Sequence, residues 1–206
     1  MNEAELFDLR RSLETIREII LFLQKDDETD DDGNYTNSHY PNLRKLAEDI
    51  MVFPQLTAKI NNILDKFGKI KDNASPELLS IRRELASTAG SISRSLNSIL
   101  RQAQAEGYVD KDVTPTVRDG RLVIPVAPGM KRKIRGIVHD ESATGKTVFI
   151  EPAEVVEANN RIRELEGEEK REVIRILREF TSLLTPNIRE FQRAMSFLAD
   201  VEFCRA

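Results

Sequence analysis

Apolar residues recur every three or four positions in several stretches of the chain, which is the spacing of one face of an α-helix. In residues 1–24 this face is formed by Leu6, Leu9, Leu13, Ile16, Ile20 and Leu23. Asn2 and Glu5 stand three positions apart at its start and predict a capping box. Residues 41–67 show the same period, and Pro54 divides them into two helical pieces. The first part of the chain is therefore predicted to be helical.

Two longer helices are predicted further along, at residues 75–106 and 152–184. Each has roughly thirty residues, which gives a rod of about 45 Å. Two rods of matching length, each with one apolar face, cover each other best as an antiparallel pair. A last helix is predicted from Thr185-Pro186 and is still periodic at Ala206. This abrupt end indicates a fragment of a longer protein.

Between the two long helices the apolar period changes to that of short β-strands. The runs "VTPTVR" and "RLVIPV" flank Asp119-Gly120, a strong hairpin signal, and "KIRGIVH" with "TVFIE" predicts a second hairpin. We therefore expect a mainly α fold of long antiparallel helices, with a small antiparallel β unit inserted at their tip. The predicted segments are 1–106, 107–151 and 152–206.

Composition narrows the class of protein. Charged residues make up 32% of the 206 residues and aromatic residues 6%, which suits long amphipathic helices. Cys204 is the single cysteine, and the sequence contains neither a signal peptide nor an apolar run long enough to span a membrane. A cytoplasmic protein without a membrane partner is expected.

Positive charge is concentrated in the predicted β unit. Residues 107–150 hold eight Lys and Arg against five Asp and Glu, whereas the whole chain carries a net charge of −4. A basic tip on acidic arms would attract a polyanion such as nucleic acid to the tip. The alternative is that "KRK" at residues 131–133 is a solubilising turn. Aromatic residues are not interleaved with the basic ones, so stacking on single strands is not indicated.

The triplet Gly145-Lys146-Thr147 matches the end of a phosphate-binding P-loop. The full pattern needs a glycine five positions before Gly145 and a helix after the loop. Asp140 occupies the glycine position, and the following "TVFIE" predicts a strand. The triplet is therefore interpreted as a hairpin loop, and no ATP site is expected in this chain.

Metal sites are not indicated either. In the acidic loop at residues 26–32 and just after it, Glu28, Asp30, Asp32 and Gly33 resemble the front of a calcium loop, but the twelfth position is His39 instead of Glu. The loop is interpreted as a solvated segment, and its role stays open. His39 and His139 are too isolated to indicate a transition-metal site.

Three blocks of the sequence together resemble a known family. They are "DGRLVIPV", "KIRGIVHDESATGKTVFIEPAEVVEANN" and "DKFGKIKDNASPELLSIRRELA". They resemble the core, lever and clamp region of the MutS family, specifically its second bacterial subfamily. The resemblance covers residues 41–206, and "GIVHDESATGKTVFIEP" is its most specific part. It implies that residues 1–106 are a helical core and first lever helix, residues 107–151 a β clamp, and residues 152–206 a second lever helix with a returning core helix.

The resemblance also implies a function. Members are homodimeric ATPases whose levers connect a nucleotide domain to clamps that embrace DNA. They lack the mismatch-reading domain, usually end in a Smr nuclease domain, and are linked to suppression of recombination and to rescue of collided ribosomes. ATP and Mg²⁺ would bind in a domain that begins soon after residue 206. The chain itself is therefore expected to need no cofactor and to be no enzyme.

The resemblance makes seven basic residues candidates for contacts with a nucleic-acid backbone. They are Arg118, Arg121, Lys131, Arg132, Lys133, Arg135 and Lys146. The favoured target is DNA, branched or duplex, and the alternative is a ribosome-binding arm that uses the same residues on ribosomal RNA or protein. Lys and Arg side chains of this kind contact phosphates and not bases, so the sequence does not distinguish DNA from ribosomal RNA as the target. Asn159 and Asn160 are interpreted as structural.

Overall fold

The computed structural model describes residues 1–25 and 40–205, and the chain within them divides into two compact units. The first unit contains Met1–Ser75 and Val173–Ala206, and the second contains Pro76–Glu172. The acidic loop, with Glu28, Asp30, Asp32, Gly33 and His39, lies outside the described residues.

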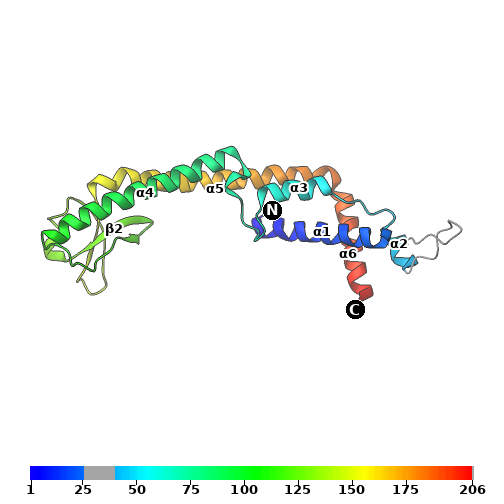
Figure 1. Ribbon diagram of the computed structural model, residues 1–206, viewed down its shortest axis with the longest axis horizontal. Helices are drawn as coiled ribbons and strands as arrows, with labels where there is room; N and C mark the ends of the chain where they lie inside the picture. The colour runs from blue at the N-terminus through cyan, green and yellow to red at the C-terminus, as the bar shows by residue number, and fades with distance from the viewer. Residues whose placement is uncertain (26–39, 206) are drawn as a thin grey trace. The chain divides into compact units, whose positions relative to one another are not determined.

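Helices build the first unit (Figure 1). They are α1 (Glu3–Lys25), α2 (Pro41–Ala47), α3 (Pro54–Ile63), the end of α5 (Val156–Leu184) and α6 (Ile188–Arg205). The predicted capping box is confirmed, since the Asn2 amide donates to Glu5 Oε2 at 2.8 Å and the Glu5 amide donates to Asn2 Oδ1 at 2.9 Å. The apolar face of α1 meets α3 and α6. Phe53 and Phe191 stack at 4.1 Å between ring centroids inside this core.

A long helix, the start of α5 and a small sheet form the second unit. Helix α4 (Pro76–Ala105) lies beside α5 and runs antiparallel to it. Arg82, near the start of α4, pairs with Glu169, whereas Ile92, further along α4, lies in one core cluster with Val155, just before α5 begins. The predicted antiparallel helix pair with a β unit near one end is thus confirmed within this unit (Figure 1).

The sheet has four antiparallel strands in the order β1-β2-β4-β3. They are β1 (Thr116–Arg118), β2 (Arg121–Val126), β3 (Gly136–Glu141) and β4 (Val148–Pro152). Asp119 and Gly120 have φ of 49° and 72°, as the predicted tight turn between β1 and β2 requires. A bulge between Val138 and Asp140 shifts the register of β3 against β4. His139 lies in this bulge on the edge strand, and its side chain contacts Glu151.

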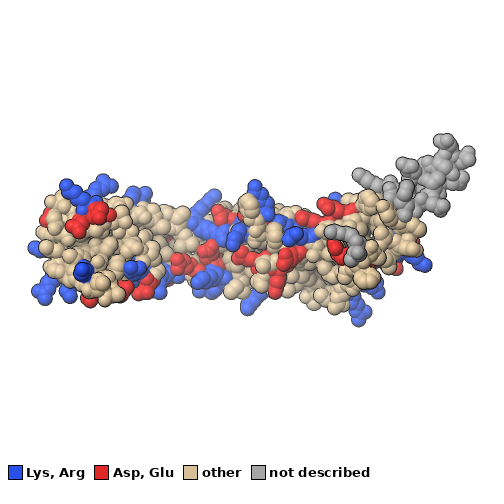
Figure 2. Space-filling model, turned by 90° about the horizontal axis from the view of Figure 1, so that it is seen from below, with Lys and Arg blue, Asp and Glu red and all other residues tan. Residues whose placement is uncertain are grey.

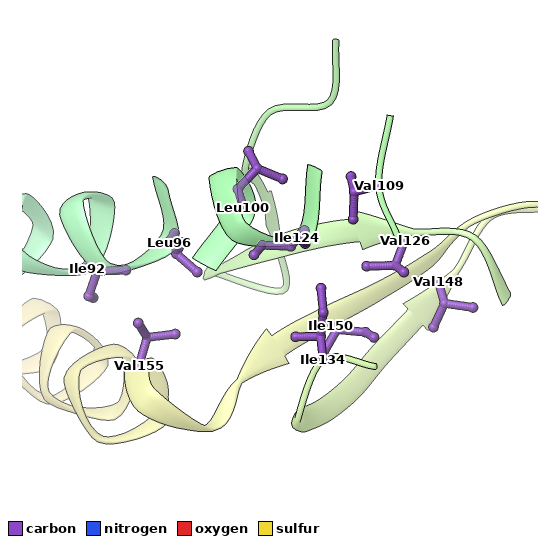
Figure 3. Packing of buried hydrophobic residues seen from close by; sticks show 11 residues of the cluster. Ile92, Leu96, Leu100, Val109, Ile124, Val126, Ile134, Val148, Ile150 and Val155 are labelled. Carbon is purple, nitrogen blue, oxygen red and sulfur yellow. The ribbon is translucent and has the colours of Figure 1, made fainter. Parts of the chain in front are cut away.

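One apolar face of the sheet packs against the end of α4 (Figure 3). The buried cluster contains Ile92, Leu96, Leu100, Ala103, Val109, Ile124, Val126, Ile134, Val148, Ile150 and Val155. These side chains come from α4 and the loop after it, from strands β2 and β4, from the β2–β3 connection and from the turn before α5, so burying them joins the sheet to the helices. The core thus holds the loops and turns that carry the basic residues.

Candidate nucleic-acid interface

A completely buried carboxylate lies at the centre of the opposite side of the sheet. Glu151 on β4 has a side-chain exposure of 0%. Its Oε1 accepts hydrogen bonds from Arg121 Nη1 at 2.7 Å and from Asn159 Nδ2 at 2.8 Å. Its Oε2 lies 2.5 Å from His139 Nε2. The carboxylate therefore joins β2, β3 and α5 to β4.

The partners of Glu151 also set its ionisation. Burial alone would raise the pKa of its carboxyl group. Hydrogen bonds from His139, Asn159 and Arg121, together with the Arg121 charge, outweigh burial and hold the pKa below its ordinary value. Glu151 is thus a carboxylate at neutral pH, and its charge is balanced inside the unit.

Asn159 and Asn160 attach the start of α5 to the sheet. The buried Asn159 amide accepts from the Leu122 backbone N–H at 3.3 Å and donates to the Leu122 carbonyl at 3.2 Å. Asn160 Oδ1 accepts from Arg121 Nη2 at 2.6 Å. Both amides make contacts inside the unit, in agreement with their structural interpretation from the sequence.

Two of the seven candidate residues are engaged with their own sheet. The Arg121 side chain is 15% exposed, and its two terminal nitrogens, Nη1 and Nη2, donate to Glu151 and Asn160. The Arg118 guanidinium lies 4.2 Å from the Phe149 ring centroid, and its Nε lies 3.8 Å from Asp140 Oδ2. Arg118 is 45% exposed, so it retains part of its surface, whereas the charge of Arg121 is compensated.

Lys131, Arg132, Lys133 and Arg135 lie together in the connection from β2 to β3. The connection turns at the 3₁₀ helix Pro128–Met130 and is anchored by the buried Ile134. All four basic side chains are exposed. Lys133 Nζ lies 5.2 Å from the centroid of the Tyr108 ring. Lys131, Arg132 and Arg135 form no ion pair with any residue among 1–25 and 40–205.

Lys146 projects from the loop between β3 and β4. Ser142 closes this loop, since the Thr147 amide donates to its Oγ at 3.0 Å and the Gly145 amide donates to its carbonyl at 2.7 Å. Gly145 has φ of 65°, which a glycine adopts without strain. Strand β4 begins at Val148, so a strand follows Lys146 where a P-loop has a helix. The hairpin interpretation of this triplet is confirmed.

The seven candidates do not form one patch. Register pairs Gly136 with Pro152 at one end of the β3–β4 hairpin and Glu141 with Val148 at the other. Arg135 therefore lies at one end of the hairpin and Lys146 at the other, about 15–20 Å apart for strands of this length. Figure 2 shows Lys and Arg side chains spread over the sheet-bearing part of the molecule, on the left, with Asp and Glu among them. The exposed cations are thus one cluster in the β2–β3 connection and Lys146 at the other end of the hairpin.

Sequence reasoning missed Glu151 and Tyr108. Glu151 is a lone acid within the apolar run "TVFIEP", a pattern that predicts a buried strand, and a buried acid requires a cationic or hydrogen-bonding partner. Tyr108 follows the Gly107 helix stop and lies next to the basic run only in space.

No group of three or more His, Cys, Asp or Glu side chains among residues 1–25 and 40–205 could hold a metal ion. In the same residues no helix is both long and apolar enough to cross a membrane.

Comparison with known proteins shows what the chain is similar to. No family model matches it. It is 37% identical over its whole length to 26% of a protein named endonuclease MutS2 from Halothermothrix orenii. A protein of the same name from Geobacillus sp. is 34% identical over 98% of the chain, and one from Pelotomaculum thermopropionicum is 37% identical over 81%.

The chain spans only about a quarter of the length of these curated relatives, since it covers 21–26% of them. Within that quarter the match includes the β unit, the long helices and the blocks on which the resemblance was based. The resemblance is therefore confirmed, and the chain is homologous from end to end to one region of the MutS2 proteins.

Proposed function

We propose that this chain is the lever and clamp region of a MutS2-type protein and that its β unit binds the backbone of nucleic acid. In this proposal residues 107–151 are the clamp, and the long helices on either side are the levers. The residues that contact phosphate are Lys131, Arg132, Arg135 and Lys146. The target is DNA, branched or duplex.

The observation that carries the proposal is the difference between paired and unpaired cations in one small sheet. Arg121 is neutralised by a buried carboxylate, whereas Lys131, Arg132, Arg135 and Lys146 are exposed and form no ion pair within the described residues. Exposed cations on a firmly packed scaffold neutralise phosphates and release counterions. The distance between Lys146 and the other three favours contact with an extended backbone over the binding of one small anion.

Arg118 and Arg121 take a different role in this proposal. Arg121 holds β2 to β4 and α5 through Glu151 and Asn160, so it positions the sheet. Arg118 lies over Phe149 on the same side of the sheet. We expect neither to contribute a full phosphate contact.

The test is the salt dependence of binding. The chain should bind a 30-base-pair duplex weakly and without sequence preference, with a slope of log affinity against log salt of roughly −3 to −4 for about four phosphates. Replacing Lys131, Arg132, Arg135 and Lys146 together by Ala should bring this slope close to zero. A matched control replaces four exposed cations of the first unit, Arg11, Arg17, Lys45 and Lys59, by Ala and removes the same charge.

Comparing the two variants shows whether a loss of affinity comes from the proposed surface or from the lower net charge of the whole molecule. Equal loss of affinity in both variants would overturn the proposed surface. Four-way DNA junctions and ribosomal RNA are measured in parallel, because the alternative function is a ribosome-binding arm with the same cations. Tighter binding of ribosomes than of every DNA at equal salt would select that alternative.

The whole protein is expected to bind more tightly than this chain. The resemblance implies a homodimer with a nucleotide-dependent domain, in which two clamps act on one duplex. A second linked contact raises the affinity by about a hundredfold or more through effective concentration. ATP hydrolysis and nuclease chemistry would belong to the remaining three quarters of such a protein.

A further inference from the structure

A cavity of about 210 Å³ opens at the end of α4, beside the basic connection between β2 and β3. Its apolar part is formed by Ile99, Ala103 and Ile134. Its polar part is formed by Gln102, Glu106, Tyr108, Lys133, Arg135 and Glu154. An aromatic ring, two carboxylates and two cations thus line one small space, although they come from three separate segments of the chain.

The position of Tyr108 is set by the end of the helix. Gly107 has φ of 74°, and the Tyr108 amide donates to the Ala103 carbonyl at 2.8 Å, which is the bond pattern of a Schellman motif. The Tyr108 hydroxyl is hydrogen-bonded to Glu106, and Lys133 Nζ lies over its ring. The ring is therefore held in one place at the cavity wall.

The two carboxylates on the wall favour a neutral ring over a phosphate as the occupant. Glu106 remains ionised at neutral pH, because hydrogen bonds from Gln102 and then from Tyr108 lower the pKa of its carboxyl group. Glu154 is a second, exposed acid on the wall. A phosphate in the cavity would be repelled by the carboxylates of Glu106 and Glu154. A neutral ring with N–H donors could instead donate to these carboxylates and contact the Tyr108 ring. Arg135 is exposed and forms no ion pair within the described residues, so it is available to a phosphate beside the cavity.

We propose that this cavity receives the base of an unpaired nucleotide while Arg135 contacts the phosphate next to it. The inference rests on the proposed nucleic-acid function and adds a preference to it. A base with several N–H donors, such as guanine, suits the two carboxylates. A base inside a duplex stays stacked, so the site discriminates in favour of bulged, gapped or branched substrates.

The experiment measures binding of the whole 206-residue chain to two labelled duplexes by fluorescence anisotropy. One duplex is perfectly paired, and the other carries a single bulged guanine. The bulged duplex should bind roughly tenfold more tightly, which is the size expected for one base stacked on an aromatic ring. A duplex with a bulged abasic site controls for bending and should bind like the perfect duplex.

Three variants locate the preference, and a fourth serves as the control. Tyr108→Ala should abolish the tenfold preference, and Tyr108→Phe should retain most of it because the ring remains. Glu154→Ala should also reduce the preference for the bulged duplex. Because Glu154 is exposed, its replacement should leave the fold intact, so this variant tests the cavity even if Tyr108→Ala lowers stability. Lys146→Ala, outside the cavity, should weaken both duplexes equally.

The outcomes separate this inference from the proposed function. Equal affinity for the paired, bulged and abasic duplexes, with the expected salt slope, would overturn the base site and leave the backbone function standing. A preference that survives both Tyr108→Ala and Glu154→Ala would place the unpaired base elsewhere and would also overturn the site. Absence of salt-dependent binding to every duplex would remove the proposed function itself.

Discussion

The guanidinium of Arg121 donates a 2.7 Å hydrogen bond to the carboxylate of Glu151, whose side chain is completely buried. The two residues belong to β2 and β4, which are neighbours in the sheet. His139 and Asn159 complete the shell of donors around the same carboxylate. A buried carboxylate is stable only when a positive charge and hydrogen-bond donors replace the solvent around it. This pair therefore determines how the sheet holds together and removes Arg121 from the set of free cations.

Removing the cation of this pair should destabilise the protein strongly. Arg121→Met leaves the Glu151 carboxylate buried without its positive partner, and we expect the free energy of unfolding to fall by about 3 kcal/mol. Urea unfolding measured by circular dichroism tests this. The matched control is Arg118→Met, whose ion pair with Asp140 is half exposed and should change stability by less than about 1 kcal/mol. Similar losses in the two variants would contradict the special role of Arg121.

Stability should depend on pH through Glu151. Its pKa is lower in the folded protein than in the unfolded chain, so folding is favoured while the carboxyl group is ionised. This contribution is complete above the unfolded pKa of about 4.3 and is lost as pH falls through the folded value. Thermal unfolding between pH 7 and pH 3 should show a smaller fall in Tm for Glu151→Gln than for the unaltered chain. Parallel curves would show that other carboxyl groups dominate.

Gly136 is expected to tolerate no side chain. A Cβ atom there would lie 2.1 Å from the backbone carbonyl oxygen of Glu151, and the backbone on both sides belongs to paired strands. Gly136→Ala should therefore force β3 away from β4 and lower the free energy of unfolding by about 3 kcal/mol. At Gly129 a Cβ would meet no atom within 4 Å, so Gly129→Ala serves as the control and should change little. A Gly136→Ala variant as stable as the control would show that β3 can shift without cost.

The chain should neither bind nor hydrolyse ATP. Lys146 lies in a hairpin loop that is followed by β4, and Asp140 stands where a P-loop needs its first glycine. Isothermal titration with Mg²⁺ and ATP should give no binding heat, and phosphate release should match the buffer. Magnesium-dependent turnover that disappears in Lys146→Ala would contradict this expectation.

Local features of this protein are determined by the sequence alone. The period of apolar residues predicts α1 and the long helices, because burying one face of a helix requires that spacing whatever the partner is. Asn2 with Glu5 and Asp119 with Gly120 specify a helix start and a tight turn, since their side-chain and backbone chemistry acts within a few residues. The same local reasoning identifies Gly145-Lys146-Thr147 as a hairpin loop.

Element boundaries follow the sequence less closely. The predicted division at Pro54 is confirmed, since α3 begins there, but α2 already ends at Ala47 and α3 ends at Ile63, before the predicted end at residue 67. Strand β3 begins at Gly136 and extends to Glu141, beyond the predicted end at His139, because pairing with β4 and the bulge set its limits. Pairing across a sheet depends on a partner strand, and that partner is distant in the sequence.

The state of each charge was decided only by the tertiary structure. Arg121 and Lys131 are both basic residues of the same segment, yet the fold brings Glu151 and Asn160 to Arg121 and leaves Lys131 in solvent. Tyr108 meets Lys133 because a helix end and a strand connection converge in space. Burial and long-range pairing determine whether a charge is compensated or available, and both arise when segments far apart in the chain pack together.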